Sequence, residues 1–283
     1  MSGAPRNLAM RWLSRPASET QVTHGARLWL YLLAGLIIVF LIIPTLIVIP
    51  MSFSDSQYLE FPPSNWSVRW YGNYFGSNEW MTATWVSIKA ALLTVIVITP
   101  IATMAAYGLY VSDLKAARYV FVLLITPMMV PVILIAIGVF FAYTRLHLNN
   151  TMLGLVLAHS ALALPMSLIV ISAGLRGYDM NQERVARSLG ASRLRAFMVV
   201  TLPQIRFSVI TGALLAFIVS FDEVIVALFI SGRDLSTITR SMFLALRDQI
   251  DPTIAAISTI MILITTAALI IARTFGQSAQ DES

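Results

Sequence analysis

Six long apolar segments, separated by short polar ones, constrain this chain more than any other feature. They lie at 28–51, 81–110, 119–143, 151–175, 207–230 and 253–272. Each has roughly the 20 mostly apolar residues that a helix needs to cross a bilayer. None shows the period-two alternation of barrel strands, and backbone groups in lipid must be paired within a helix or a closed barrel. The sequence therefore predicts an all-α membrane protein with six transmembrane helices.

The composition favours one membrane domain. Hydrophobic residues make up 58% of the 283 residues, charged residues make up 12%, and cysteine is absent, which excludes disulfides and thiolate chemistry. No polar stretch is long enough for a separate globular domain, so we expect a transmembrane domain at 28–275. Segment 28–51 is too long for a cleaved signal peptide and is expected to be a retained span. A cytoplasmic N-terminal segment at 1–27 and a cytoplasmic tail at 276–283 complete the predicted organisation.

Lysine and arginine are distributed unevenly between the two sides of the predicted domain. Thirteen lie on the side of the two termini, and five lie on the other side. The richer side holds Arg6, Arg11, Arg15, Arg27, Lys115, Arg118, Arg176, Arg184, Arg187, Arg193, Arg195, Arg206 and Arg273. Because cytoplasmic loops carry the excess of positive charge, both termini and the 176–206 loop are predicted to be cytoplasmic. This topology accounts for the net charge of +5, so nucleic-acid binding is not expected.

Prolines and aromatic residues suggest local features of the spans and of the first external loop. Pro100, Pro127, Pro131 and Pro165 are expected to kink or break spans two, three and four. The loop 52–80 is rich in tryptophan and tyrosine, which favours an anchoring belt at headgroup level over direct contact with a partner.

Helix-capping residues in the cytoplasmic loop 178–203 predict two short helices. Asp179 and Gln182 have the spacing of a capping box, which predicts a short helix over 180–189. Gly190 is placed to end that helix in the left-handed conformation that glycine adopts at little cost. Ser192 can cap a second short helix that leads into span five. Two short helices joined at a glycine, with apolar residues among charges, indicate a loop that docks onto another protein.

The same loop resembles the EAA loop of bacterial ABC importer permeases. In that pattern, EAA is followed by three residues, Gly, nine residues, Ile, one residue and Leu-Pro. Ala186, Gly190, Val200 and the pair Leu202 and Pro203 fit this spacing without gaps. The Glu and the first Ala of the pattern fall on Arg184 and Val185, and the acidic residue stands one place earlier, at Glu183.

Other stretches are similar to the spermidine/putrescine subgroup of this family, and the resemblance covers about residues 30–275. They are Thr126–Pro131, Ala158-His159, Leu164-Pro165, Ser220–Glu223 and Ser231-Gly232. The resemblance implies the type I (MetI-like) permease fold in the bacterial inner membrane. It also implies a second permease subunit, two copies of a cytoplasmic ATPase, and a periplasmic substrate-binding protein. The transported solute would be putrescine, spermidine or a related small cationic amine.

The resemblance assigns ATPase coupling to one set of residues, and the chain itself lacks an ATPase site. The coupling residues are Asp179, Glu183, Ala186, Gly190, Leu202 and Pro203. The sequence has no G-x-x-x-x-G-K-[ST], and its only lysines are Lys89 and Lys115, so no P-loop can form. We therefore expect no catalytic residue, no metal and no cofactor on this chain, with ATP and Mg²⁺ used by the partner ATPase.

Asp222 and Glu223 are carboxylates inside predicted span five, where a charged side chain costs about 2.5–3.5 kcal/mol to insert. On a continuous helix, adjacent residues point about 100° apart. One of them is expected to line the substrate pathway with Phe221, and the other to pair across the permease interface or with Lys89. A purely structural pair is the alternative.

Two other classes of membrane protein are alternatives to a permease. A secondary transporter or channel for a small cation could also have six spans, but it would not need a docking loop, and no inverted repeat is evident. An intramembrane enzyme would need a feasible nucleophile and base. His159 and Ser160 are neighbours and diverge on a helix, and the three histidines lie in different regions.

Overall fold

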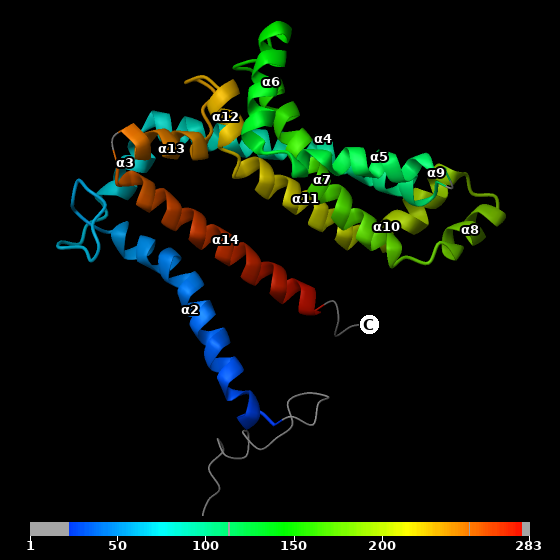
Figure 1. Ribbon diagram of the computed structural model, residues 1–283, viewed down its shortest axis with the longest axis horizontal. Helices are drawn as coiled ribbons and strands as arrows, with labels where there is room; N and C mark the ends of the chain where they lie inside the picture. The colour runs from blue at the N-terminus through cyan, green and yellow to red at the C-terminus, as the bar shows by residue number, and fades with distance from the viewer. Residues whose placement is uncertain (1–22, 113, 249, 279–283) are drawn as a thin grey trace, which may run out of the picture. The chain divides into compact units, whose positions relative to one another are not determined.

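The computed structural model describes residues 23–112, 114–248 and 250–278, with side chains as far as residue 266. Most of the predicted segment 1–27, including Arg6, Arg11 and Arg15, and part of the tail 276–283 lie outside these limits. The described residues form helices joined by loops, with one isolated β-bridge between Ser54 and Trp66 (Figure 1). The all-α prediction is confirmed. By its contacts the chain divides into two compact units, 1–74 with 251–283, and 75–250.

The first unit contains helix α2 (Leu28–Met51), most of α3 (Arg69–Gly76) and α14 (Thr253–Ser278). Helix α2 coincides with the first predicted span and packs against α14. None of its residues is buried, so its apolar surface is available to lipid or to another chain. The Asn73 amide donates a hydrogen bond to the Thr253 hydroxyl (2.8 Å), which ties α3 to the start of α14.

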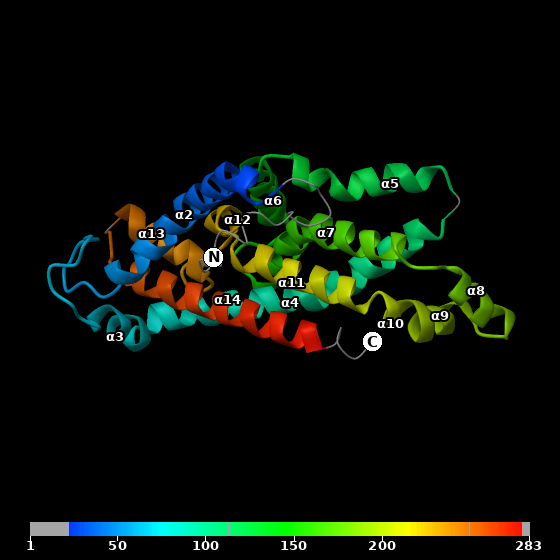
Figure 2. The same cartoon turned by 90° about the horizontal axis from the view of Figure 1, so that it is seen from below.

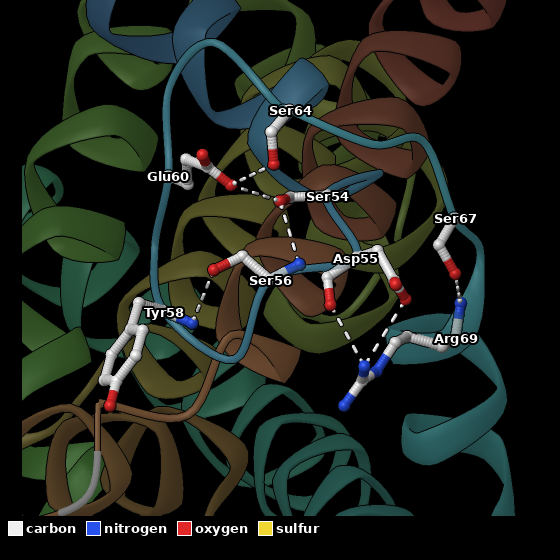
Figure 3. Close-up of polar contacts among 8 residues, drawn as sticks. All are labelled: Ser54, Asp55, Ser56, Tyr58, Glu60, Ser64, Ser67 and Arg69. Atoms are coloured by element: carbon white, nitrogen blue, oxygen red, sulfur yellow. Dashed lines mark hydrogen bonds and ion pairs between the residues drawn. The ribbon is translucent and has the colours of Figure 1, made fainter.

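The loop between α2 and α3 is held by its own polar side chains (Figure 3). The Glu60 carboxylate accepts hydrogen bonds from the hydroxyls of Ser54 (3.3 Å) and Ser64 (3.1 Å). The Arg69 guanidinium donates to the backbone oxygen (3.0 Å) and to the carboxylate (3.3 Å) of Asp55. These contacts give the loop a defined shape without regular secondary structure.

The aromatic residues of the segment 52–80 differ in their exposure. Trp66 and Tyr58 are 70% and 73% exposed, whereas Trp70 and Tyr74 are buried. Buried rings stabilise the fold and are not free to meet lipid headgroups. The anchoring belt stays a prediction, and of the residues predicted for it Trp66 is exposed.

Three helices of the second unit, α4 (Asn78–Tyr110), α7 (Met152–Arg176) and α11 (Arg206–Phe221), run side by side (Figures 1 and 2). Their core combines alanines, such as Ala102, Ala163 and Ala216, with larger aliphatic side chains. Small side chains let membrane helices approach closely. The Ser167 hydroxyl of α7 donates a hydrogen bond to the backbone carbonyl of Gly212 in α11 (2.8 Å). The loop 178–203 connects α7 to α11 within this closely packed group of helices.

Gly174 marks a very close approach between α7 and α11. A Cβ atom at this position would lie 2.5 Å from the Cβ of Ser208. Gly174→Ala is therefore expected to force the two helices apart. Overpacking of this kind lowers the free energy of unfolding by about 1–3 kcal/mol. Thermal unfolding of the purified protein in detergent measures the effect as a lower melting temperature.

Two further variants test whether the clash with Ser208 causes the expected loss of stability. Adding Ser208→Gly to Gly174→Ala should restore stability to that of Ser208→Gly alone, because the clashing side chain is gone. Gly108→Ala in α4, where a Cβ meets nothing within 4 Å, should not lower the melting temperature. An unchanged melting temperature for Gly174→Ala would contradict the close approach.

The third predicted span, 119–143, is broken in the middle. Helix α5 (Ala116–Ile125) continues into the 3-10 turn η2 (Thr126–Met129), and the chain then bends by 100° into α6 (Val132–Leu146). Val130 is extended (φ −90°, ψ 132°), because Pro131 disfavours helical geometry at the residue before it. The expected break is confirmed here, whereas α4 and α7 continue past Pro100 and Pro165.

The described residues contain three helices long and apolar enough to cross a membrane as they stand, Gly25–Met51, Asn78–Tyr110 and Met152–Arg176. Counting each of two bent pairs as one span raises the number to five. These pairs are Ala116–Met129 with Val132–Leu146, and Arg193–Gln204 with Arg206–Phe221. Thr253–Thr266, in the sixth predicted span, is a shorter apolar helix. Each predicted span contains an apolar helix, and the count of six crossings stays a prediction.

Candidate functional site

Helix α8 (Asn181–Ser188) forms the first half of the loop 178–203, close to the predicted range 180–189. The Asp179 carboxylate accepts a hydrogen bond from the backbone N–H of Asn181 (3.0 Å), which satisfies one donor of the first turn. The N–H of Gln182 donates to the backbone carbonyl of Asp179 (3.2 Å). In the described chain, no hydrogen bond returns from the Gln182 side chain, so Asp179 caps α8 alone, without the predicted reciprocal box.

Gly190 ends α8 with a φ of 94°, in the left-handed region that was predicted for it. Its N–H donates to the carbonyl of Arg187 (3.0 Å), and the N–H of Ala191 donates to the carbonyl of Ala186 (3.1 Å). This pair of bonds is a Schellman turn. A residue with a Cβ would be strained at this φ, so Gly190 sets the direction in which the chain leaves α8.

The second half of the loop is helical almost throughout. The Ser192 hydroxyl accepts a hydrogen bond from the N–H of Arg195 (3.3 Å), as its predicted capping role requires. The chain then follows α9 (Arg193–Ala196), the π-helical turn η3 (Phe197–Thr201) and α10 (Leu202–Gln204). Leu202 and Pro203 lie at the start of α10, where proline is tolerated, and the chain bends by 78° into α11. The loop is thus joined to α11 by a nearly continuous helical path.

Glu183 points into the protein and is only 2% exposed. One carboxylate oxygen accepts a hydrogen bond from the Tyr107 hydroxyl of α4 (2.6 Å), and the other accepts one from the Thr201 hydroxyl of η3 (2.5 Å). The Thr201 oxygen also lies 3.4 Å from the hydroxyl oxygen of Tyr178. Glu183 therefore fastens α8 both to the end of α4 and to the segment that leads into α11.

The sequence does not reveal the two hydroxyl partners of Glu183. Tyr107 is 76 residues away in the chain, and Thr201 is 18 residues away. The EAA spacing marks the loop but says nothing about α4. The one signal that could have indicated these partners is that both carry a hydroxyl group and lie near the ends of predicted helices next to the loop.

The opposite face of α8 presents apolar side chains on the surface. Val185 is 59% exposed and Leu189 is 84% exposed. They are four residues apart and so share one face. At 100° per residue, Val185 lies about 200° around the helix from Glu183. One face of helix α8 thus attaches to the rest of the chain, and the other presents an apolar surface.

The fifth predicted span, 207–230, is not one helix. Helix α11 ends at Phe221, and α12 (Ile225–Ile230) begins after a short break that contains Asp222 and Glu223. The expectation that the two carboxylates project about 100° apart from a continuous helix is therefore wrong. Breaks at membrane depth persist where the freed backbone groups find partners.

The two carboxylates have different surroundings. The Glu223 side chain is half-buried and accepts a hydrogen bond from the N–H of Val226 (2.5 Å), and its backbone carbonyl accepts one from Thr239 (3.0 Å) in α13 (Ile238–Asp248). Asp222 is exposed, and no hydrogen bond or ion pair joins its carboxylate to another described residue. Lys89 takes part in neither of the ion pairs found among the described residues. Phe221 stacks on Phe217, with ring centroids 5.6 Å apart.

A buried polar contact joins α4, α7 and α11 close to this break. The Nδ1 atom of His159 (α7) lies 2.8 Å from the Ser220 hydroxyl (α11), which donates to the Thr94 hydroxyl (α4, 3.3 Å). His159 does not pair with Ser160, whose hydroxyl has no partner in the described chain. No group of three His, Cys, Asp or Glu side chains within the described ranges could hold a metal ion.

A solved structure has the same arrangement of helices. It is that of a bacterial ABC transporter involved in the import of the acidic polysaccharide alginate, and a chain of it matches with a TM-score of 0.68 at 14% identity. The match covers 93% of this chain and 99% of that one, and it places this chain in the MetI-like fold class of ABC transporter membrane subunits.

Sequence comparison specifies the family. Residues 98–280 match the family described as the binding-protein-dependent transport system inner membrane component, and the chain belongs to this family. It is 30% identical over 230 residues to the putrescine transport system permease protein PotI of Escherichia coli K12, covering 79% of this chain and 82% of that protein. It is 27% identical over 235 residues to the spermidine/putrescine transport system permease protein PotC of Haemophilus influenzae, covering 83% and 91%.

The chain is therefore a multi-pass inner-membrane permease subunit of an ABC importer. Its relatives are permeases and not ATPases, and in this family partner subunits hydrolyse ATP. The predicted family and class are confirmed, and a secondary transporter or channel is no longer an alternative.

Proposed function

We propose that this permease moves polyamines, such as putrescine or spermidine, from the periplasm to the cytoplasm. The observation that carries the proposal is the similarity to the putrescine and spermidine/putrescine permeases, which extends over about four fifths of the chain. The exposed carboxylate of Asp222, in a break between two membrane helices, adds chemistry suited to a cationic amine.

The proposed orientation has both termini and the loop 178–203 in the cytoplasm, as the excess of lysine and arginine on that side favours. The proposed partners are a second permease subunit, two copies of a cytoplasmic ATPase, and a periplasmic substrate-binding protein. ATP and Mg²⁺ are bound by the ATPase and not by this chain.

In the proposed coupling mechanism, Val185 and Leu189 dock into the ATPase, and Glu183 transmits the movement. Closure of the ATPase pair pulls on α8, and the bonds from Glu183 to Tyr107 and Thr201 pass the displacement to α4 and α11. Asp179 and the carbonyl of Ala186 secure the two ends of α8, and Gly190 sets the turn that follows. Leu202 and Pro203 connect this loop to α11.

In the proposed pathway, the two carboxylates have different roles. Asp222 attracts the amine, because its carboxylate has no partner among the described residues of this chain. Glu223 holds the break between α11 and α12 open through its contact with Val226. Phe221, stacked on Phe217, lies beside Asp222 and supplies an aromatic surface to the pathway.

Uptake of radiolabelled putrescine and spermidine tests the proposed substrate. Cells that lack this chain should lose most of the uptake, and plasmid-borne chain should restore it only when the partner ATPase is active. Unlabelled diamines and triamines should compete, whereas neutral or anionic solutes of similar length should not. Failure of the plasmid-borne chain to restore uptake of either polyamine, although the transporter assembles with an active ATPase, would exclude this substrate and leave the permease assignment intact.

A further inference from the structure

Two neighbouring pockets lie at the proposed cytoplasmic end of the second unit, one lined mainly by apolar side chains and the other by arginines. The first, called here the apolar pocket, has a volume of about 660 Å³ and lies between α4 and the segment leading to α11. Its lining includes Met104, Tyr107, Leu194, Phe197 and Met198. Met104 and Leu194 are each 70% exposed, so no described residue of this chain covers them.

The second, called here the arginine pocket, has a volume of about 380 Å³ and lies between the end of α4 and the loop helices. Arg184, Arg187 and Arg193 line it. Among the described residues, no ion pair involves any of the three. Arg184 donates a long hydrogen bond to the Asn181 side chain (3.4 Å), and the Arg193 guanidinium lies 5.8 Å from the Tyr107 ring centroid.

The two pockets are connected through Arg193, which lines both. A single ligand could therefore place an anionic group among the guanidinium groups and an apolar chain along Met104 and Met198. Glu183 also lines the arginine pocket, but its two oxygens already accept hydrogen bonds from Tyr107 and Thr201. With three guanidinium groups against one carboxylate, the pocket stays positive.

We infer that these pockets together bind an anionic phospholipid of the cytoplasmic leaflet. Guanidinium groups match phosphate geometry with paired hydrogen bonds, and basic pockets between membrane helices on the cytoplasmic side bind anionic headgroups. The acyl chain would occupy the apolar pocket, at whose mouth Met104 and Leu194 are exposed. The cytoplasmic location of the lipid rests on the proposed orientation. The presence of a basic pocket beside an apolar one does not depend on that orientation.

This lipid would not compete with the ATPase for α8. Arg187 is four residues from Glu183 and so lies on the inward face of the helix. Val185 and Leu189, the proposed ATPase contacts, lie on the other face. The lipid would brace the inward face against the end of α4, beside the Glu183 contacts.

Native mass spectrometry of the full chain in neutral detergent tests the inference with phosphatidylglycerol and phosphatidylcholine of identical acyl chains. We expect the first lipid bound to be phosphatidylglycerol. In Arg187→Gln/Arg193→Gln, its affinity should fall by about tenfold or more, because hydrogen bonds to charged groups contribute at least that much. Arg195→Gln/Arg206→Gln removes the same charge from the same end of the unit but lines neither pocket, and it should bind as the wild type does.

Three further arms identify the ligand. Met198→Trp, which fills the apolar pocket, should weaken phosphatidylglycerol binding with all arginines intact. Glycerol phosphate at equal concentration should not compete, since it lacks the acyl chain. The bound lipid should remain when the whole transporter is assembled. Equal binding of both lipids, equal loss in the two double variants, competition by glycerol phosphate, or release on assembly would each overturn the inference. None of these readouts depends on the transported solute, so they do not test the proposed polyamine specificity.

Discussion

Replacing Glu183 with alanine should reduce substrate uptake and substrate-stimulated ATP hydrolysis to about a tenth or less, although the chain still inserts into the membrane. The substitution removes the acceptor of the half-buried Tyr107 hydroxyl and the nearer of the two acceptors of the buried Thr201 hydroxyl, which keeps only Tyr178 at 3.4 Å. A buried hydroxyl left without a partner costs about 1–3 kcal/mol. Helix α8 then loses its attachment to α4 and to the segment before α11. Uptake in cells and ATP hydrolysis by the reconstituted transporter measure the loss.

Two sets of variants separate coupling from docking. Leu189→Asp, on the outward face, should prevent the ATPase from copurifying with the permease, whereas Glu183→Ala should retain much of that binding and lose coupling. Tyr107→Phe and Glu183→Gln should each have smaller effects than Glu183→Ala. Because the two side chains share a hydrogen bond, the effects of these two substitutions should not add in a double-mutant cycle. Strict additivity would mean that this hydrogen bond does not matter for transport.

Asp222→Asn should lower polyamine uptake at low substrate concentration by about tenfold or more, the factor expected for the loss of one charge-assisted hydrogen bond. Asparagine keeps the shape of the side chain and removes its charge. Assembly should be unchanged, because Asp222 is exposed and no ion pair joins its carboxylate to another described residue. Concentration-dependent uptake and copurification of the partner subunits measure the two quantities.

Substitutions at two other carboxylates test whether uptake depends on the position of Asp222 or only on the total negative charge. Asp234→Asn, at an exposed site in the 231–252 loop, should leave uptake unchanged. Glu223→Gln keeps an oxygen that can accept from Val226, so it should retain more uptake than Glu223→Ala. Full uptake by Asp222→Asn would remove this residue from the proposed pathway.

The sequence predicts those features of the fold that short stretches of chain determine. The cap at Asp179, the turn at Gly190, the cap at Ser192 and the break at Pro131 each depend on a few neighbouring residues, and each appears near its predicted position. Apolar segment length likewise locates α2, α4 and α7.

Features that depend on distant contacts were not predictable in the same way. The break after Phe221 contains neither proline nor glycine, and its stability depends in part on Thr239 of a later helix. The inward direction of Glu183 depends on a tyrosine 76 residues away. A single sequence shows each of these residues but does not show that they meet.

The two faces of α8 have a consequence for how importers of this kind can diversify. The contacts of Glu183 lie within the chain, whereas Val185 and Leu189 are exposed. Substitutions on the exposed face can therefore accumulate without disturbing the internal attachment. Under the proposed coupling mechanism, an ancestral permease could in this way exchange one ATPase for another, or share one with sister systems, while its internal attachment stayed the same.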